Sequence, residues 1–488
     1  MAEHSCSTAA LVGREDSVKP WRIGIVGGGP GGLMTAYELQ KWCNAPLRIS
    51  IFEASGRLGG KILTPGFQSV PWFYEAGAAE FYDYSMFDED PLKDLILELG
   101  LTVRPMGGPT VVMRDRALAN VDDVRAVLGE RSTAALLAFD QAAKDLITPL
   151  EFYASGEAES EGERARAGAF AEYLSRIPDD DVRHYLEVMI HSDLAAEPSQ
   201  TSLHYGLQNY LMNDSAYMNL YGIEGGNRKL PERLAESISA DVHLEHIVTE
   251  VGQGDSGLFV RGFRDGVEQC DEFDFVVIAL PHNHLKSVAY RGERLAAEMQ
   301  RHFDHFHYPA HYLRITVLFE HPFWWHSYAD SYWMLDAFGG CCLYDESARQ
   351  TGNPYGILGW LLGGDVALEH ATLSDEELIK RALDQLPPSL AQGRELVKEA
   401  HVHRWINSVN AMPGGARILP IERRHCPEPT NHSNLLVVGD YLYDSTLNGV
   451  LDSAQYVAFR ISGELAEESD PTRERLQQSR RLHERCRE

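Results

Sequence analysis

The first strongly patterned stretch of the chain is an apolar run at residues 23–26 that leads into a cluster of glycines. After the glycines, Leu33, Ala36 and Tyr37 recur at the spacing of one helix face. The next apolar run, residues 47–52, has the length of a strand. The pattern therefore predicts a strand, a helix and a second strand in that order.

A long middle part of the chain has mostly helical periodicity, from Pro91 to about Leu220. Its clearest stretch is 91–99, which Gly100 closes. Segments 121–152 and 169–192 continue the pattern, and an acidic stretch at 156–162 separates them. We expect that acidic stretch to be exposed.

Strand-like patterns return in the second half of the chain. Residues 242–251 predict one strand, and the apolar run within 273–281 predicts a strand covered on both faces. Residues 312–322 alternate imperfectly and predict a strand of a second, mixed sheet. Another apolar run at 434–438 predicts a strand, and a helix is expected to begin near Leu447.

The glycines after the first strand have the spacing Gly27-x-Gly29-x-x-Gly32. The first glycine allows a tight turn, the second lets the backbone approach a pyrophosphate, and the third lets the helix pack closely on the strand. The helix N-terminus would stabilise the anion. Glu53 follows about 20 residues later, where an acid binds an adenosine ribose. This combination predicts a dinucleotide site and leaves NAD and FAD both open.

The same glycine spacing occurs again at residues 252–257. Strand-like runs lie on both sides of this second match, and no helical pattern follows it. Without a helix there is no helix dipole to hold a phosphate. We therefore interpret residues 252–257 as a hairpin turn.

Composition narrows the function classes. The chain has 488 residues, 44% of them hydrophobic, and a formal net charge of −28. That charge argues against nucleic acid and anionic membrane surfaces as partners. The sequence shows no membrane-spanning apolar run and no secretory signal, and its seven cysteines lack framework spacing, so we expect a soluble, cytoplasmic protein. The histidines at 302, 305, 307 and 311 lack a carboxylate at ligand spacing, so no metal is expected.

A second loop motif follows Glu53, namely Ala54-x-x-Arg57-x-Gly59-Gly60-Lys61. Together with the first glycine motif it resembles the flavin-dependent amine oxidase superfamily. That superfamily includes monoamine, polyamine and L-amino acid oxidases, protoporphyrinogen oxidase and the phytoene desaturases. Most of its oxidases have Arg where this chain has Lys61, as phytoene desaturases commonly do.

Further stretches match the same family in order. Glu75 to Glu80 resembles the segment that runs beside the flavin, and Gly225-Gly226 resembles the element that opens a helix. The resemblance implies that the Val248 backbone binds adenine. The strand ending in Pro281 resembles the family's buried strand.

Residues near the implied substrate side depart from the family. Arg314 stands where many oxidases carry a lysine that holds a water near flavin N5, eight positions before the proline of Pro-Phe-Trp. Trp405 occupies the place of an aromatic near the substrate, although it could equally be a core residue. Thr446 stands where amine oxidases place an aromatic wall. Asp440 resembles the family's final acid, followed by a helix whose N–H groups would face the flavin.

The resemblance implies an α/β fold. A Rossmann-type FAD-binding domain is built from discontinuous segments, with an interrupting α+β substrate-binding domain. The expected boundaries are a flexible N-terminus at 1–20, FAD-binding segments at 21–90, 221–290 and 431–466, a helical substrate-domain segment at 91–220, a substrate-domain segment with a mixed sheet at 291–430, and a charged tail at 467–488.

The candidate site residues follow from these motifs. The candidates on the substrate and flavin face are Arg314, Trp405 and Thr446. The cofactor-binding candidates are Gly27, Gly29, Pro30, Gly31, Gly32, Glu53, Ala54, Arg57, Gly59, Gly60, Lys61, Gly77, Ala78, Ala79, Glu80, Val248, Pro281, Gly439, Asp440, Leu447, Asn448 and Val450.

The implied function is an FAD-dependent oxidoreductase that removes a hydride from an amine or amino acid to flavin N5. One alternative is a desaturase-type dehydrogenase of an apolar substrate, favoured by Lys61, Arg314 and Thr446. Another is a flavin-using non-redox enzyme. Residues 407–418 contain no cysteine, so we expect FAD to be non-covalent. Oxygen or another acceptor would reoxidise it, and a homodimer stays open.

Overall fold

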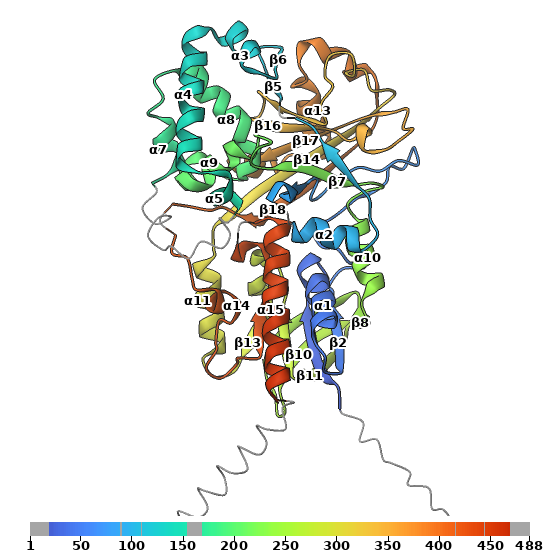
Figure 1. The fold of residues 1–488 in the computed structure, drawn as a ribbon. Coiled ribbons are helices and arrows are strands. Elements are labelled where there is room, and N and C mark those ends of the chain that lie inside the picture. The colour runs from blue at the N-terminus through green and yellow to red at the C-terminus, as the bar shows by residue number, and fades with distance from the viewer. Residues whose placement is uncertain are drawn as a thin grey trace, which may run out of the picture.

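The structure, a computed structural model, describes residues 19–87, 90–108, 110–153, 168–414, 416–443 and 445–468. Most of the expected N-terminal arm, the acidic stretch 156–162 and most of the charged tail lie outside the described residues. The chain forms two parts, one around a parallel sheet and one around a larger mixed sheet (Figure 1). Within the described ranges, no helix is both long enough and apolar enough to cross a membrane.

The parallel sheet has five strands drawn from three separate parts of the chain. Their order is β19 (Leu435–Val437), β12 (Phe275–Ile278), β1 (Trp21–Val26), β2 (Leu47–Phe52) and β8 (Ala240–His243). Helices α1 (Pro30–Trp42) and α15 (Leu447–Glu468) pack together on one face of this sheet. This is the expected discontinuous Rossmann-type arrangement, with the first strand in the middle of the sheet.

A smaller sheet covers the other face of the parallel sheet. It contains β9 (His246–Gln253), β10 (Leu258–Arg264), β11 (Val267–Phe273) and β13 (Ala289–Arg291). The hairpin interpretation of residues 252–257 is confirmed, because the Gly254 N–H donates to the Gly257 carbonyl at 2.8 Å. The single strand expected at 242–251 is wrong. Glu245 has a φ of 56° and turns the chain, which divides this stretch between β8 and β9 in two sheets.

The mixed sheet has seven strands. Their order is β18 (Val397–Asn410), β14 (Pro309–Phe319), β17 (Gly356–Gly363), β16 (Cys341–Asp345), β15 (Tyr332–Leu335), β5 (Thr110–Met113) and β6 (Arg116–Leu118). Strand β14 confirms the strand expected at 312–322. The range 91–220 is less uniformly helical than its pattern indicates, since it contributes β5 and β6 here and β4 (Val103–Met106) to a third sheet with β3 (Phe81–Asp83) and β7 (Asn219–Ile223).

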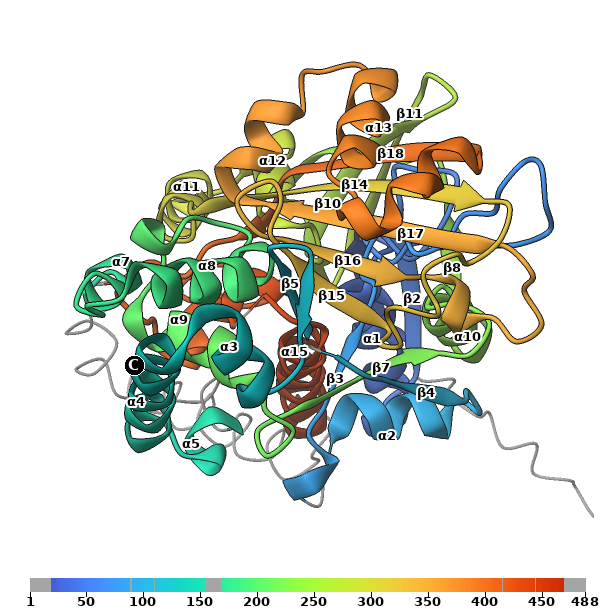
Figure 2. The same cartoon turned by 90° about the horizontal axis from the view of Figure 1, so that it is seen from above.

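Helices from the middle of the chain gather on one side of the mixed sheet (Figure 2). They are α3 (Val121–Leu128), α4 (Glu130–Leu146), α7 (Phe170–Leu174), α8 (Asp180–Leu194) and α9 (Leu203–Leu211). Helix α8 contacts β15, β16 and β17 directly. The helix expected at 91–99 is α2 (Pro91–Glu98), which packs in the core of the parallel sheet instead.

Side chains alternate between the two faces of the mixed sheet. Leu313 on β14 and Cys341 on β16 pack with α13 (Asp375–Asp384) in one apolar core. The next residue on each strand, Arg314 and Cys342, points to the opposite face, on the side of α8. We call these the apolar face and the polar face. The alternation follows from the two-residue period of a strand.

Candidate active site

The first glycine loop forms a tight passage from β1 to α1. Gly27 has a φ of +114°, and a Cβ there would meet the Ala279 carbonyl oxygen at 2.5 Å. A Cβ on Gly32 would lie only 2.0 Å from the Gly27 oxygen. Both positions therefore require glycine.

Helix α1 begins without a side-chain cap, because its N-cap residue is Gly29. A Cβ on Gly29 would meet only the Gly60 Cα, at 3.8 Å. Uncapped N–H groups beside this open space form a ready site for an anion such as a pyrophosphate. The residues of this loop therefore fit the phosphates of a dinucleotide.

Glu53 lies at the end of β2 and orders the neighbouring loops. Its carboxylate accepts hydrogen bonds from the Gly28 N–H at 2.9 Å and from the Ser55 N–H at 2.8 Å. Val248 on β9 is buried in the same core cluster as Phe52. The predicted ribose and adenine residues are therefore neighbours in the fold.

The second loop, residues 57–61, packs backbone to backbone against the first. The Gly59 N–H donates to the Gly28 carbonyl at 2.9 Å, and a Cβ on Gly60 would come within 3.1 Å of the Gly29 Cα. The Arg57 guanidinium donates to the Gly60 carbonyl at 2.6 Å, and burial lowers the pKa of Arg57. The Arg57 side chain thus stabilises the loop to which it belongs. We call residues 27–32 and 57–61 together the glycine cradle.

Residues 431–466, the expected third FAD-binding segment, meet the glycine cradle through Lys61. The Lys61 ammonium forms an ion pair with Asp440 and donates to the Ser408 carbonyl at 2.9 Å. Helix α15 begins directly after Thr446, whose hydroxyl oxygen accepts a hydrogen bond from the Gly449 N–H at 3.1 Å. Thr446 thus caps this helix, and its role on the substrate side stays a prediction.

The loop of residues 75–80 lies between the glycine cradle and the polar face. On the cradle side, the Ala78 N–H donates to the Lys61 carbonyl at 3.0 Å, and a Cβ on Gly77 would collide with the same oxygen. On the polar face, the Trp405 indole N–H donates to the Ala76 carbonyl at 2.6 Å. Trp405 therefore stands at the junction between the expected cofactor and the polar face.

A buried ionic network fills part of the polar face. Arg314 is 1% exposed and forms an ion pair with Glu346. Arg349 lies 3.0 Å from the other Glu346 oxygen. The Arg314 guanidinium lies 4.6 Å from the centre of the Tyr344 ring, in space that Gly359 on β17 leaves open.

Glu75 joins this network from the loop. Its two oxygens accept hydrogen bonds from the Asn227 N–H at 2.8 Å and the Thr64 hydroxyl at 2.7 Å. Burial raises the pKa of Glu75 to about 7, and Arg349 opposes this shift only partly. Sequence reasoning missed Glu346 and Arg349, because nothing in their local sequence indicates that they meet Arg314.

Two carboxylates and four tyrosines occupy the rest of the polar face. We call this group the acid–tyrosine cluster; it consists of Glu80, Asp193, Tyr82, Tyr312, Tyr332 and Tyr344. Burial raises the pKa of both carboxyls above their usual range. Glu80 was predicted beside the cofactor, and the structure places its carboxylate next to Tyr344 and Arg349.

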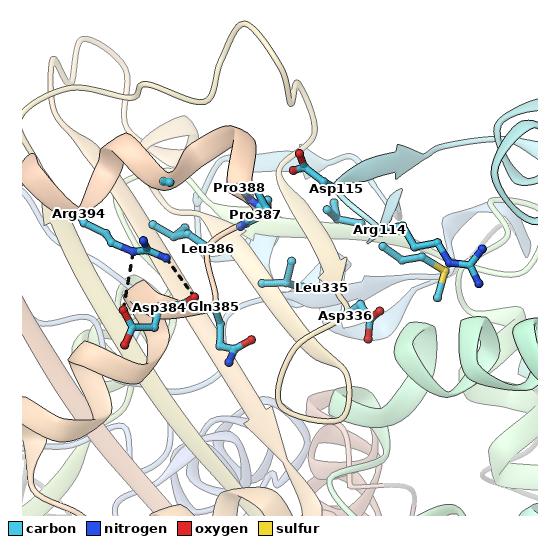
Figure 3. Close-up of a pocket in the computed structure, with 13 residues that line it drawn as sticks. Arg114, Asp115, Leu335, Asp336, Asp384, Gln385, Leu386, Pro387, Pro388 and Arg394 are labelled. Carbon is cyan, nitrogen blue, oxygen red and sulfur yellow. Dashed lines mark hydrogen bonds and ion pairs between the residues drawn. The ribbon is translucent and has the colours of Figure 1, made fainter.

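An open surface pocket of about 450 Å³ lies elsewhere, between the β5–β6 turn and the segment after α13 (Figure 3). Asp115, Asp336 and Arg394 line it, and Arg394 pairs with Asp384 at 3.8 Å. None of the cradle or cluster residues borders this pocket. We therefore place the candidate active site at the polar face.

The predicted cofactor residues converge on one region. The loops of the glycine cradle touch each other, residues 77–80 border them, and Gly439 and Asp440 reach them through Lys61. Pro281 follows β12 at the same edge of the parallel sheet, and Val450 is buried in the first turn of α15. Across the described ranges, no group of three or more His, Cys, Asp or Glu side chains is arranged to hold a metal ion.

Known proteins resemble this chain at low sequence identity. It is 25% identical over 307 residues to the flavin-dependent L-tryptophan oxidase RebO of Lentzea aerocolonigenes, which covers 56% of this chain and 60% of that protein. It is 23% identical over 421 residues to polyamine oxidase 5 of Oryza sativa subsp. japonica, covering 81% of this chain and 77% of that protein. The chain thus spans less than two thirds of the tryptophan oxidase.

Solved structures share the fold. Putrescine oxidase, in a structure bound to putrescine, superposes with a TM-score of 0.69 at 18% identity, covering 91% of this chain and 99% of that chain. Cyclohexylamine oxidase from Brevibacterium oxydans IH-35A gives 0.68 at 19% identity, covering 92% and 100%. Residues 30–462 match the family described as flavin containing amine oxidoreductase. The chain therefore belongs to that flavin-containing family.

Proposed function

We propose that this protein is an FAD-dependent oxidoreductase that removes a hydride from the carbon next to the nitrogen of an amine or amino acid. The observation that carries the proposal is the position of the acid–tyrosine cluster. The loop 75–80 contacts the glycine cradle on one side and carries Glu80 into the cluster on the other. When bound, FAD would supply the hydride acceptor.

The residues of the chain would bind and orient both reactants. The glycine cradle and the N-terminus of α1 would hold the pyrophosphate, Glu53 the ribose, and the start of α15 the flavin. Glu80 and Asp193 would attract a cationic substrate, and the tyrosine rings would exclude water around it. We include in this proposal non-covalent FAD, oxygen as the first acceptor to test, a cytoplasmic location and a homodimer.

The desaturase alternative fits the polar face less well than amine oxidation does. A desaturase of an apolar substrate calls for an apolar surface, and this face carries six ionisable acids and bases in Glu75, Glu80, Asp193, Arg314, Glu346 and Arg349. A flavin-using non-redox enzyme would also bind its substrate beside the cradle, and a flavin that no donor bleaches would identify it. We therefore keep amine oxidation as the proposal.

An anaerobic absorbance titration tests the proposal. Purified holoprotein is titrated with primary and secondary amines, L-amino acids, and polyene and tetrapyrrole precursors. We expect an amine or amino acid to bleach the visible band of oxidised flavin, and admission of air to restore it with release of peroxide. Bleaching only by polyene or tetrapyrrole precursors, bleaching by no donor, or a protein that binds no flavin contradicts the proposal.

A further inference from the structure

Asp193 stands in an unfavourable place for an acid. It lies in the last turn of α8, where the helix C-terminus already carries partial negative charge. Its Oδ2 atom has no accessible surface and no hydrogen-bond partner among the described residues. The Tyr312 hydroxyl donates to the backbone carbonyl of Asp193 at 3.3 Å, so β14 comes directly up to this end of α8.

Glu80 reaches the same place from a different part of the chain. The Tyr344 hydroxyl hydrogen-bonds to its carboxylate, and its Oε2 atom is likewise buried and without a partner in the described ranges. Buried polar atoms in folded proteins almost always have partners. Two orphaned carboxylate oxygens among tyrosine rings therefore indicate that a cation belongs between them, because ring faces also attract positive charge.

The charges of the polar face leave an excess of acid. Arg314 and Arg349 share Glu346, and Glu75 and Glu80 also lie near Arg349. Arg314 and Arg349 each keep two side-chain nitrogen atoms without a hydrogen-bond partner in the described ranges, although both guanidinium groups form ion pairs with Glu346. A substrate carboxylate would add to this excess, whereas a substrate cation would neutralise it.

We propose that Glu80 and Asp193 together bind a positively charged group of the substrate, and that this pair selects cationic amines over substrates that carry a carboxylate. This inference rests on the proposed function and names its substrate class. Asp193 is then a specificity-determining residue on the buried face of α8.

Binding of the cation should release a proton. Burial and Glu80 both raise the pKa of Asp193, and a cation bound beside this carboxylate would lower that pKa again, so binding should shift the carboxyl from its protonated toward its ionised form. The other groups that face Asp193 are Tyr82 on β3, Tyr312 on β14, Tyr332 on β15, and Cys342 and Tyr344 on β16, and Tyr205 on α9 lies near Tyr82 and Tyr312. Burial raises the pKa of the thiol and of these cluster tyrosines, so all of them stay neutral. Affinity for the cation should therefore rise with pH until Asp193 ionises unaided.

Isothermal calorimetry on the holoprotein tests this inference with ligands that are not amine donors. The probes are butyltrimethylammonium, its zwitterionic relative 4-(trimethylammonio)butanoate, and the neutral 3,3-dimethylbutan-1-ol. We expect the cation to bind about tenfold tighter than either of the others, because it alone brings a net positive charge between the two carboxylates and the tyrosine rings. Titrations in two buffers of different ionisation enthalpy should report a net release of protons when the cation binds.

The Asp193→Asn variant should weaken binding of the cation about tenfold and abolish the proton release. Asp181→Asn, at the exposed start of the same helix, is the matched control and should change neither. If Asp193→Asn fails to fold, Glu80→Gln and the pH dependence of the wild-type protein replace it. Equal affinity for cation and zwitterion, or unchanged binding in Asp193→Asn, overturns the inference.

The two proposals fail in different ways. If an amine bleaches the flavin and Asp193→Asn binds butyltrimethylammonium as tightly as the wild-type protein, only the proposed binding of a cation by Glu80 and Asp193 is refuted. Tight, proton-linked binding of butyltrimethylammonium by a protein whose flavin no amine bleaches would refute amine oxidation alone.

Discussion

The two faces of the mixed sheet are built from the same strands but differ in the kind of side chain that they bury. On the apolar face, Leu313 and Trp360 pack with Leu378 of α13, and all three are fully buried. On the polar face, Arg314 and Tyr344 are equally buried and belong to an ionic network. Neighbouring residues thus serve opposite purposes, because a strand sends successive side chains to opposite sides.

This difference separates stability from chemistry. Burial of apolar surface on the apolar face stabilises the sheet without specifying any ligand. The polar face buries charges whose desolvation offsets most of their mutual attraction. We infer that the apolar face allows the sheet to tolerate an acid-rich surface on its other side. Substitutions on the two faces should therefore separate into effects on folding and effects on binding.

The largest expected effect is the loss of Glu346. Glu346→Leu leaves Arg314 and Arg349 buried without their shared carboxylate, so it should destabilise the protein by about 3 to 5 kcal/mol in urea unfolding. Adding Arg314→Met to this variant should recover part of the loss. A single substitution that leaves the unfolding midpoint unchanged would show that the network does not hold the polar face together.

An apolar-face substitution should reduce stability alone. Leu313→Ala should cost about 3 kcal/mol of unfolding free energy, because Leu313 is fully buried in the core with α13. The dissociation constant for butyltrimethylammonium should not change. If the folded variant bound butyltrimethylammonium more weakly than the wild-type protein does, the two faces would not act independently.

Glu75 should make stability depend on pH. Its pKa of about 7 in the folded protein lies above its usual value, so the folded state holds a proton that the unfolded state loses. The stability contribution is therefore complete below about pH 4.5 and is lost as the pH rises through about 7. Glu75→Gln should remove this pH dependence, which is on the order of 3 kcal/mol. Parallel pH profiles for the two proteins would contradict the assignment.

The smallest expected effect separates two adjacent residues. Cys341 faces the apolar core, and Cys342 faces the acid–tyrosine cluster. Cys341→Ala and Cys342→Ala should each cost about 1 kcal/mol of stability, and only Cys342→Ala should alter affinity for the cation. Equal effects of both substitutions on calorimetric binding would count against the assignment of faces.

Sequence alone predicted the parallel-sheet part well. The spacing of Gly27, Gly32 and Glu53 is local, and both glycines are required by the backbone geometry of a tight turn from a strand into a helix. The division of 242–251 at Glu245 was missed, because the strand-like pattern continues through the two-residue turn Leu244–Glu245. The exact domain boundaries stay a prediction.

The acid–tyrosine cluster could not be predicted in the same way. Glu80 and Asp193 lie in distant segments, and only the packing of α8 on the mixed sheet brings them together. The Arg314 side chain could be placed near the substrate by resemblance, but its pairing with Glu346 depends on strand register. Such pairings arise from tertiary structure and leave no local signal.

The most direct test of the account compares one tyrosine from each face. Tyr344 hydrogen-bonds to Glu80 on the polar face, whereas Tyr328 packs against Trp333 on the apolar face and hydrogen-bonds to Ser389. Anaerobic stopped-flow measurement of flavin reduction against amine concentration gives the dissociation constant for each variant. We predict that Tyr344→Phe raises it about tenfold, since Glu80 loses the hydrogen bond that favours its ionised, cation-binding form, and that Tyr328→Phe leaves it unchanged. Equal dissociation constants in the two variants would contradict the account.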